Sequence, residues 1–128
     1  MSVIEFNHME GEHMDLIKII KALSHQNRLR ILNLINQQDL CVCELEYIMD
    51  VNQSNASRHL TKLKEANIIY GKRKAQWIYH QINEKLLDEH IFLKEIIDNE
   101  LKNIKLINDD NDKLKKYLAS GLSCEDLT

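Results

Sequence analysis

The sequence predicts a mainly α-helical domain that carries one small β-hairpin. Proline is absent and glycine occurs only three times in 128 residues, so few turns are forced on the chain and helix is favoured. Apolar residues make up 44% of the sequence and charged residues 29%, which is typical of a globular domain rather than of a disordered chain. One central segment is rich in the β-branched and aromatic residues that favour strands. From the length we expect residues 1–128 to form a single domain.

The first two helices are expected over about 12–23 and about 26–37. The first carries three apolar residues that repeat with the helical period and share one face. These are Leu16, Ile20 and Leu23. The second has apolar residues on too many sides for a single stripe, so it should lie at the centre of the domain. Ser24, between the two, is a residue type that commonly caps the start of a helix.

A short helix over about 42–50 and a longer helix from Asn52 to about Ala66 are predicted next, separated by a tight link. Asn52 is a favoured N-cap. The outward face of the longer helix is polar and carries basic side chains. Its residues are Ser54, Asn55, Arg58, Thr61, Lys62 and Glu65. This order of elements is a helix-turn-helix pattern, in which the second helix reads the major groove of DNA.

Two short strands are predicted at 68–70 and 77–79, where the chain reads Ile-Ile-Tyr and Trp-Ile-Tyr. A basic tip joins them, which is typical of a β-hairpin. A hairpin directly behind a helix-turn-helix makes the winged version of that fold, with cations on the wing that hold DNA phosphates. The DNA-reading unit therefore covers about 42–82. The cations of the tip are Lys72, Arg73 and Lys74.

A long helix is expected over about 84–107. Its apolar stripe is longer than the core of a small monomer can cover, so we expect it to pair with a second copy of the chain, together with the first helix. The stripe consists of Leu86, Leu93, Ile97, Leu101 and Ile104. Residues 108–128 are expected to form a C-terminal tail, because the Asn-Asp-Asp-Asn run at 108–111 interrupts the pattern. A short helix near 112–119 is expected in this tail, and Gly121 suits a helix end.

The charge is unevenly distributed along the chain. The net charge is −3, but residues 52–80 hold six basic side chains and one acidic side chain, and the segments on either side are acidic. Such a basic segment favours contact with a polyanion such as DNA. The start of the chain is acidic and has no basic segment followed by an apolar stretch, so we expect no signal peptide. No apolar run reaches the roughly 18 residues of a membrane span. We therefore expect a cytoplasmic protein with no membrane partner.

Three stretches together resemble the ArsR–SmtB family of bacterial winged-helix repressors. They are ALSHQNRLRILNLI, LCVCELEYIMDVNQSNASRHLTKLKEANII and KRKAQWIYHQI, and the resemblance covers about 15–83. It implies a homodimer that binds operator DNA when free of metal and leaves the DNA when a metal or metalloid binds. Ala75 stands where the family often has glycine, and Ser54 replaces a common proline. The resemblance also implies recognition-helix roles for Gln53, Ser54, Asn55, Ser57 and Arg58.

Cys41 and Cys43 are the candidate inducer site. Thiolates bind soft ions, and a helix N-terminus lowers the pKa of a thiol, so a pair at the start of a helix suits this role. Residues two apart point about 200° from each other on a regular helix, so both can hold one ion only if the first turn is extended or unwound. We expect ion binding to distort this helix and thereby loosen DNA. The sequence LCVCEL resembles the branch of the family that responds to arsenic, antimony or cadmium and lead.

Pyramidal As(III) prefers three thiolates, and Cys124 is the remaining thiol of the chain. It can reach the pair within its own subunit or across the dimer, or it can be a free thiol in the tail. Without it, two thiolates would be completed by a water molecule, Glu44 or a small thiol. We predict As(III) or Sb(III) as the inducer, with Cd(II) or Pb(II) as alternatives, since soft thiolates suit all four ions. The predicted ligands are Cys41, Cys43 and Cys124.

A second metal pattern is incomplete. Asp88 and His90 match the start of a zinc site found in other family members, but the partner positions hold Leu101 and Ile104, which cannot bind zinc. Asp88 and His90 are therefore interpreted as surface or capping residues. His59 is interpreted as a half-buried packing residue. His8 and His13 are interpreted as residues of the N-terminal tail.

No enzyme class fits the sequence. It has no glycine-rich phosphate loop and no clear Ser/His/Asp set, and Cys41 and Cys43 lack the Cys-x-x-C spacing of a redox pair. A disulfide across one residue would also be strained. The remaining alternative is a repressor that senses oxidants or electrophiles with the same thiols. Release from DNA by an oxidant rather than by a metalloid would distinguish it.

Overall fold

The computed structural model describes residues 15–128 and confirms the predicted fold class, mainly helical with one β-hairpin. The first helix covers 15–23. It is followed by α2 (Gln26–Gln37), α3 (Val42–Met49), α4 (Gln53–Glu65), β1 (Ile69–Lys74) and β2 (Trp77–Ile82). The chain continues with α5 (Glu84–Glu89), α6 (Ile91–Asp98), the 3₁₀ helix η1 (Glu100–Asn103), α7 (Lys105–Ser120) and α8 (Cys124–Leu127). Within the described range, no helix is both long enough and apolar enough to cross a membrane.

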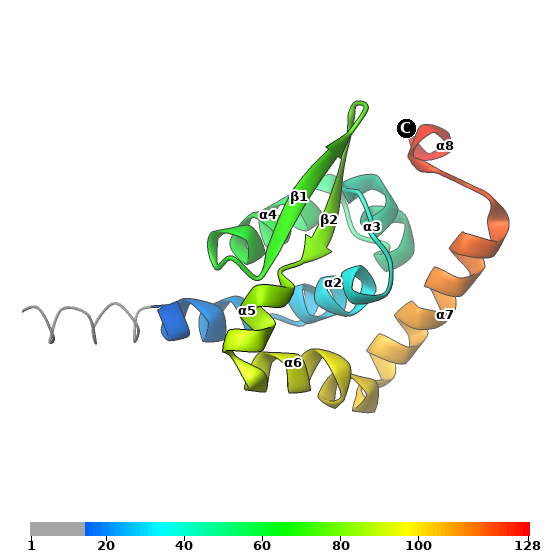
Figure 1. Cartoon of the computed structure of the whole chain (residues 1–128). Helices are drawn as coiled ribbons and strands as arrows, with labels where there is room; N and C mark the ends of the chain where they lie inside the picture. Colours follow the sequence, from blue (N-terminus) through cyan, green and yellow to red (C-terminus); the bar gives the residue numbers. More distant parts are fainter. Residues whose placement is uncertain (1–14) are drawn as a thin grey trace, which may run out of the picture.

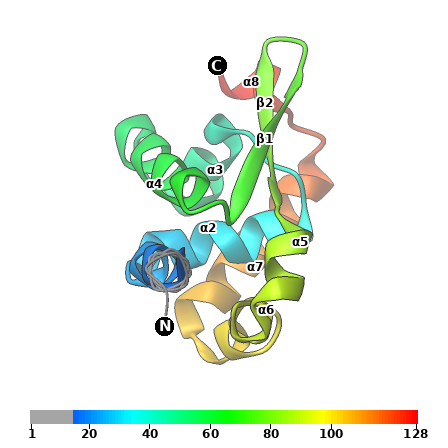
Figure 2. The same ribbon diagram turned by 60° about the vertical axis from the view of Figure 1, so that its left-hand side comes forward.

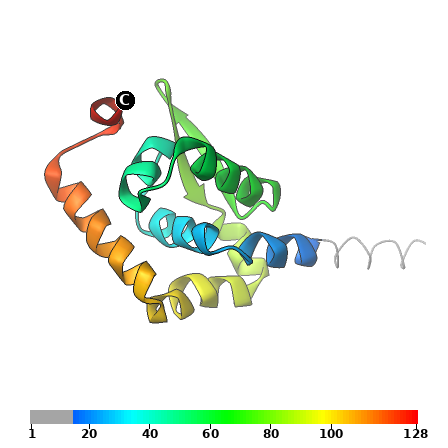
Figure 3. The ribbon, with the colours of Figure 1, turned by 180° about the vertical axis from the view of Figure 1, so that it is seen from behind.

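The helix α2 runs through the middle of the molecule (Figure 1). The helices α3 and α4 and the hairpin lie on one side of it, and α5 and α6 lie on the other (Figures 1 and 2). Seen from behind, α7 closes one end of the molecule and leads to α8 (Figure 3). Four residues of α2 are at most 3% exposed: Ile31, Leu32, Leu34 and Ile35. The central position predicted for this helix is therefore confirmed, because a helix apolar on most sides can only be covered from most sides.

The start of α2 differs from the predicted cap. Its N-cap is His25, whose ring Nδ1 accepts a hydrogen bond from the backbone N–H of Asn27 (3.2 Å). Ser24, expected in this role, instead donates its hydroxyl to the carbonyl oxygen of Lys21 (2.7 Å). The prediction is wrong because the link between the two helices is very short, and Ser24 completes the last turn of the first helix.

The hairpin is longer than predicted. Its closing pair is Lys74 and Trp77, and the turn consists of Ala75 and Gln76 alone. Ala75 has a φ of 57°, in the left-handed region that two-residue hairpin turns require and that glycine adopts more readily. The basic run 72–74, expected at the tip, therefore lies on β1, where its side chains are exposed.

The prediction of a single helix over 84–107 is wrong. The backbone leaves helical geometry at His90, Asn99 and Ile104, which divides this segment into α5, α6, η1 and the start of α7. Three members of the predicted dimer stripe are at most 3% exposed within one copy of the chain: Leu93, Ile97 and Leu101. The apolar residues do repeat with the helical period, but the breaks between the helices let most of them pack into the core of their own chain.

The segment 108–128 is more ordered than the predicted tail, because it contains most of α7 and all of α8. The helix expected near 112–119 and the helix end at Gly121 are confirmed, since α7 ends at Ser120 and Gly121 is its C-cap. The polar run at 108–111 lies inside α7, where the Asp110 side chain is fully buried. Its two carboxylate oxygens accept hydrogen bonds from Nε and Nη2 of Arg30, at 2.8 and 2.9 Å. The Arg30 guanidinium also donates to the Met49 carbonyl at the end of α3 (3.1 Å) and to the Asn27 side chain (3.0 Å). The ion pair therefore joins α2, α3 and α7.

Further polar contacts extend this connection along α2. The amide groups of Asn33 and Gln37 both donate to Oδ1 of Asn111, each at 2.7 Å. Arg30, Asn33 and Gln37 are spaced as residues on one face of a helix, so they form a single polar seam against α7. A short polar stretch that resembles a helix break in the sequence is thus the surface by which α7 docks.

We expect single substitutions in the ion pair to be strongly destabilising. Arg30→Met or Asp110→Leu leaves the other charge buried and unpaired, which should lower the free energy of unfolding by about 3–5 kcal/mol. The double variant should be more stable than either single variant, because no charge then remains buried. Urea unfolding of the four proteins measures the difference.

The exposed Lys62–Glu65 pair (3.6 Å) supplies a control. Glu65→Gln should change the free energy of unfolding by less than about 1 kcal/mol. If the Arg30 and Asp110 variants cost no more than this control, the ion pair does not hold α7 in place.

Candidate nucleic-acid interface and sulfur cluster

The turn between α3 and α4 has the predicted tight geometry. Asp50 ends α3 in the left-handed conformation, with φ 56° and ψ 52°. Asn52 is the N-cap of α4, and its side-chain oxygen accepts a hydrogen bond from the N–H of Asn55 (2.8 Å), as predicted. These two residues set the angle at which α4 leaves α3.

The residues predicted to read DNA are not equivalent in the structure. Four of them are exposed on α4: Gln53, Ser54, Arg58 and Lys62. Asn55 is half-buried, and its Oδ1 accepts a hydrogen bond from Nδ2 of Asn27 on α2 (3.2 Å). Ser57 is half-buried and lines a hollow between α4 and the hairpin. The two basic side chains predicted on this face are thus exposed, whereas two of the predicted polar side chains are partly covered.

A buried histidine docks α4 on α2. His59 is 1% exposed, and its Nδ1 accepts a hydrogen bond from Nε of Arg28 (3.2 Å). Its ring also packs against the ring of His25, with centroids 4.1 Å apart. Burial lowers the pKa of His59 from its ordinary 6.5 to about 4, and the nearby charges of His25 and Arg28 act in the same direction. The packing role predicted for His59 fits this position, although the side chain is buried rather than half-buried.

The hairpin presents its cations along a strand. Lys72, Arg73 and Lys74 are exposed, and the Arg73 Nε donates to the carbonyl oxygen of Ala75 in the turn (3.2 Å). The base of the hairpin is fixed to the chain before α3, because the N–H of His80 donates to the Leu40 carbonyl (2.9 Å). The wing is thus attached beside the first cysteine of the pair.

Three sulfur atoms meet at the start of α3. The Sγ atoms of Cys41 and Cys43 are 2.9 Å apart, and Cys41 forms a disulfide with Cys124, the first residue of α8. All three sulfur atoms lie within 4.8 Å of one another. Among the alternatives for Cys124, the structure places this thiol at the pair within its own chain rather than free in the tail. Two parts of the chain separated by 83 residues therefore build one cluster.

The pair converges without distortion of α3. Cys41 is the N-cap and has an extended backbone (φ −90°, ψ 170°), so it lies outside the helix while Cys43 lies in the first turn. The extended backbone at Cys41 is the first of the two alternatives expected, extended or unwound, and it lets both sulfur atoms face one point.

Glu44, Tyr117 and Tyr79 surround the cluster, and of these only Glu44 is predicted from the sequence as a site residue. Oε1 of the buried Glu44 accepts a hydrogen bond from the N–H of Cys41 (3.0 Å), and Oε2 accepts one from the hydroxyl of Tyr117 on α7. The Tyr79 hydroxyl of β2 lies 3.7 Å from Sγ of Cys124. The spacing of Glu44 from the cap is a capping-box signal, but no sequence signal identifies Tyr117. Both carboxylate oxygens of Glu44 thus accept hydrogen bonds that hold Cys41 and Tyr117 in place.

The electrostatics of the free thiol differ from the expectation. Burial raises the pKa of Cys43 above its ordinary value, and the negative charge of Glu44 raises it further. Burial and Glu44 outweigh the backbone N–H groups at the start of α3, which lower the pKa of Cys43 as expected, so the net shift is upward. Burial also raises the pKa of Tyr117, which keeps its hydroxyl protonated as the donor to Glu44.

The remaining candidate residues do not join the cluster. Asp88 is exposed and His90 lies at the junction of α5 and α6, while Leu101 of the incomplete zinc pattern is buried in the core. His8 and His13 lie outside the described residues.

Comparison with known proteins gives a consistent family. The sequence profile described as "Bacterial regulatory protein, arsR family" matches residues 25–70. The chain is 38% identical over 69 residues to the arsenic resistance transcriptional regulator ArsR1 of Pseudomonas putida, covering 53% of this chain and 54% of that protein. It is 30% identical over 81 residues to the arsenical resistance operon repressor of Escherichia coli, covering 57% of this chain and 69% of that protein. For the arsenic-resistance regulators matched at 36–41% identity, the chain spans 54–63% of their length.

The fold is also that of a solved structure. The homodimeric winged helix-turn-helix DNA-binding domain Mb0332 of Mycobacterium bovis, described as a possible ArsR-family regulator, superposes with a TM-score of 0.61. The two are 22% identical, and the match covers 82% of this chain and 94% of that chain. This likeness establishes the winged helix-turn-helix arrangement of α3, α4 and the hairpin.

The docking histidine generates a pH prediction. An NMR titration of the folded protein should place protonation of His59 at about pH 4. Because the folded pKa is depressed, the unfolded chain binds the proton more readily, and stability is lost as the pH falls from 6.5 towards 4. His59→Gln should therefore weaken the dependence of the unfolding midpoint on pH in this window. A midpoint near the ordinary value for His59 in the folded protein would contradict the packing described for α4.

Proposed function

The chain belongs to the arsR family of bacterial regulatory proteins, and from this premise we propose that it is a homodimeric repressor of transcription. In its reduced, metal-free state it binds operator DNA through α4 and the hairpin. A thiophilic metalloid, As(III) or Sb(III), releases it by binding Cys41, Cys43 and Cys124. The observation that carries this proposal is the convergence of these three sulfur atoms within 4.8 Å.

The chemistry of the donor set fits a trivalent metalloid. Three thiolates match the pyramidal coordination of As(III), and soft sulfur ligands favour it over harder ions. Arsenous acid exchanges its three hydroxyl groups for three thiolates, so that three As–S bonds form, three As–O bonds break and each thiol proton leaves with a hydroxyl as water. The exchange is redox-neutral, but Cys41 and Cys124 must first be reduced to thiols by a cellular dithiol.

The position of the cluster supports its use as a switch. Cys41 precedes α3, which packs against the reading helix α4, and Leu40 pairs with His80 of the hairpin. Tyr79 of the same strand lies beside Cys124. An ion bound to the three sulfur atoms thus touches the elements that carry both DNA-contacting surfaces. To shift the protein from mostly bound to mostly released, it must favour the low-affinity state by several kcal/mol, which sulfur bonds can supply.

Dimerisation is part of the proposal. The first helix exposes Ile17 and Ile20 at 43% and 51%, and α6 begins with Ile91 at 74%. These apolar side chains, rather than the buried part of the 86–104 stripe, are the surface that a second copy would cover. A twofold dimer presents two equivalent reading helices, so the operator should be pseudo-palindromic.

Two alternatives use the same thiols. Cd(II) or Pb(II) would also bind a soft sulfur site. The Cys41–Cys124 disulfide favours a second candidate function, in which oxidation itself switches the repressor. In that case two of the three ligands are consumed by the disulfide, and only Cys43 stays free.

Cysteine variants should separate the metalloid switch from the redox switch. Each of Cys41→Ser, Cys43→Ser and Cys124→Ser should keep DNA binding and lose most of the response to arsenite, because a hydroxyl binds soft ions poorly. Fluorescence anisotropy of the labelled promoter DNA of this gene, under reducing conditions, measures release. Zn(II) serves as the ion that should not release the wild type.

Cys43→Ser is the decisive variant. In the redox mechanism this variant should still leave DNA on treatment with diamide, because Cys41 and Cys124, which form the disulfide, are both present. Arsenite should then have no effect on the wild type. If the Cys41→Ser, Cys43→Ser double variant dissociates at the wild-type arsenite concentration, the sensor site lies elsewhere.

The DNA interface generates a separate prediction. Arg58→Ala should weaken operator binding and relax its sequence preference, since this residue lies on the exposed face of α4. Alanine at Lys72, Arg73 and Lys74 should weaken binding uniformly across sequences and flatten the salt dependence by about one unit for each phosphate that is no longer bound. Unchanged affinity of the triple variant would remove the hairpin from the interface.

A further inference from the structure

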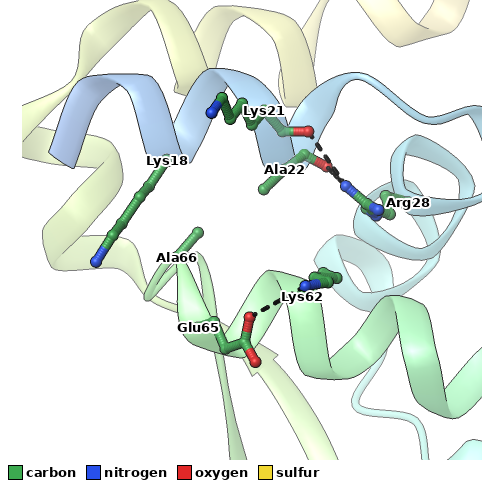
Figure 4. A pocket seen from close by; sticks show the side chains of 7 residues that line it. All are labelled: Lys18, Lys21, Ala22, Arg28, Lys62, Glu65 and Ala66. Atoms are coloured by element: carbon green, nitrogen blue, oxygen red, sulfur yellow. Dashed lines mark hydrogen bonds and ion pairs between the residues drawn. The ribbon is translucent and has the colours of Figure 1, made fainter. Parts of the chain in front are cut away.

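A hollow of about 450 Å³ lies between the first helix, the start of α2 and the second half of α4 (Figure 4). We infer that it binds a phosphate-type oxyanion, and that on DNA this is a backbone phosphate beside the groove read by α4. The inference rests on the proposed function for the source of the phosphate. The hollow, here called the lysine pocket, is lined by Lys18, Lys21, Ala22, Arg28, Lys62, Glu65 and Ala66.

The lysine pocket has a strong excess of positive charge. Its cations come from three elements: Lys18 and Lys21 from the first helix, Arg28 from α2, which follows it directly, and Lys62 from the more distant α4. Among the described residues 15–128, Glu65 is the only carboxylate that lines it, and this carboxylate is 3.6 Å from Nζ of Lys62. Three positive charges are therefore left without a compensating acid among the residues that line the hollow. An oxyanion is the ligand class that this charge distribution attracts.

One of these cations is held in place before any ligand binds. The Arg28 Nε donates to His59, and its Nη1 donates to the carbonyl oxygens of Lys21 and Ala22, at 3.1 and 3.4 Å. None of these acceptors is a carboxylate, so no negative charge among them offsets that of the guanidinium. A fixed guanidinium loses little conformational freedom on binding a phosphate. The small side chains of Ala22 and Ala66 leave room for the ligand.

Continuity with the reading helix favours DNA as the source of the phosphate. Lys62 lines the pocket and stands one helical turn after Arg58 on the exposed side of α4. A duplex lying along α4 would therefore pass from Arg58 to Lys62 and on to the lysines of the first helix. A free oxyanion such as inorganic phosphate has the same chemistry, and the experiment separates these two sources.

The test compares two variants with an equal reduction in positive charge. Lys18→Ala, Lys21→Ala removes two pocket lysines while keeping a good helix former at each position. Lys115→Ala, Lys116→Ala removes two exposed lysines of α7, which lies at the other end of the molecule from the first helix (Figure 1). Binding to a random-sequence duplex is measured by anisotropy over a range of salt concentrations, so no operator needs to be known.

We expect the pocket variant to bind the duplex about tenfold or more weakly at low salt, and its salt slope to fall by about one for each phosphate that the pocket no longer binds. The α7 variant should behave as the wild type. A pocket variant indistinguishable from the α7 variant overturns the assignment to DNA.

A second measurement uses inorganic phosphate without DNA. Chemical shifts of the Arg28 side chain are followed by NMR during the titration. Saturable chemical-shift changes in the wild type that disappear in the pocket variant support an oxyanion site. If the salt slope of duplex binding is the same in the pocket variant as in the wild type, these changes assign the site to a free anion. Absence of both effects overturns the inference. Failure of the wild type to bind any duplex would instead refute the proposed function, and the phosphate titration would still decide on the pocket.

Discussion

The buried ion pair between Arg30 and Asp110 determines how the two ends of this protein are assembled. A charged side chain at the centre of an apolar helix is tolerated only when its donors find partners, and the Arg30 guanidinium finds Asp110, the Met49 carbonyl and Asn27. The pair fixes α7 in register against α2. Asp110, Leu114 and Tyr117 share one buried face of α7, so the same register delivers Tyr117 to Glu44 and leads the chain to Cys124. The sulfur cluster thus depends on a contact made well away from it.

The two sides of α2 hold the two functional parts of the molecule. One polar seam binds α7, while Asn27 and Arg28 at the start of α2 dock the reading helix through Asn55 and His59. Both sets of contacts are directional hydrogen bonds rather than apolar packing alone, so they specify position as well as stability. Because α2 is held on both sides in this way, it fixes the positions of α4 and α7 relative to each other.

The local features of the fold could be predicted, and the non-local ones could not. The bounds of α2, the Asn52 cap and the hairpin follow from periodicity, capping and β-propensity, which act over a few residues. The partner of Asp110 is 80 residues away, so its burial leaves no pattern in the sequence around it. Leu93 and Ile97 illustrate a second limit of prediction from sequence. Apolar residues repeat in the same way whether that face of the helix packs against its own core or against a second chain. At the sulfur cluster, the chemistry of Cys41 and Cys43 could be predicted, whereas the roles of Glu44 and Tyr117 needed the fold.

The long separation of Arg30 from Asp110 also bears on how the protein is made. The helix that contains Arg30 leaves the ribosome early, but its buried partner Asp110 is synthesised 80 residues later. Until that segment emerges, burial of α2 would leave an unpaired guanidinium in the core, which is unfavourable. The nascent chain therefore has little to gain from settling its central helix during synthesis. Closure of the core around α2 should therefore wait for Asp110, and a fragment that ends before α7 should be unable to complete its core.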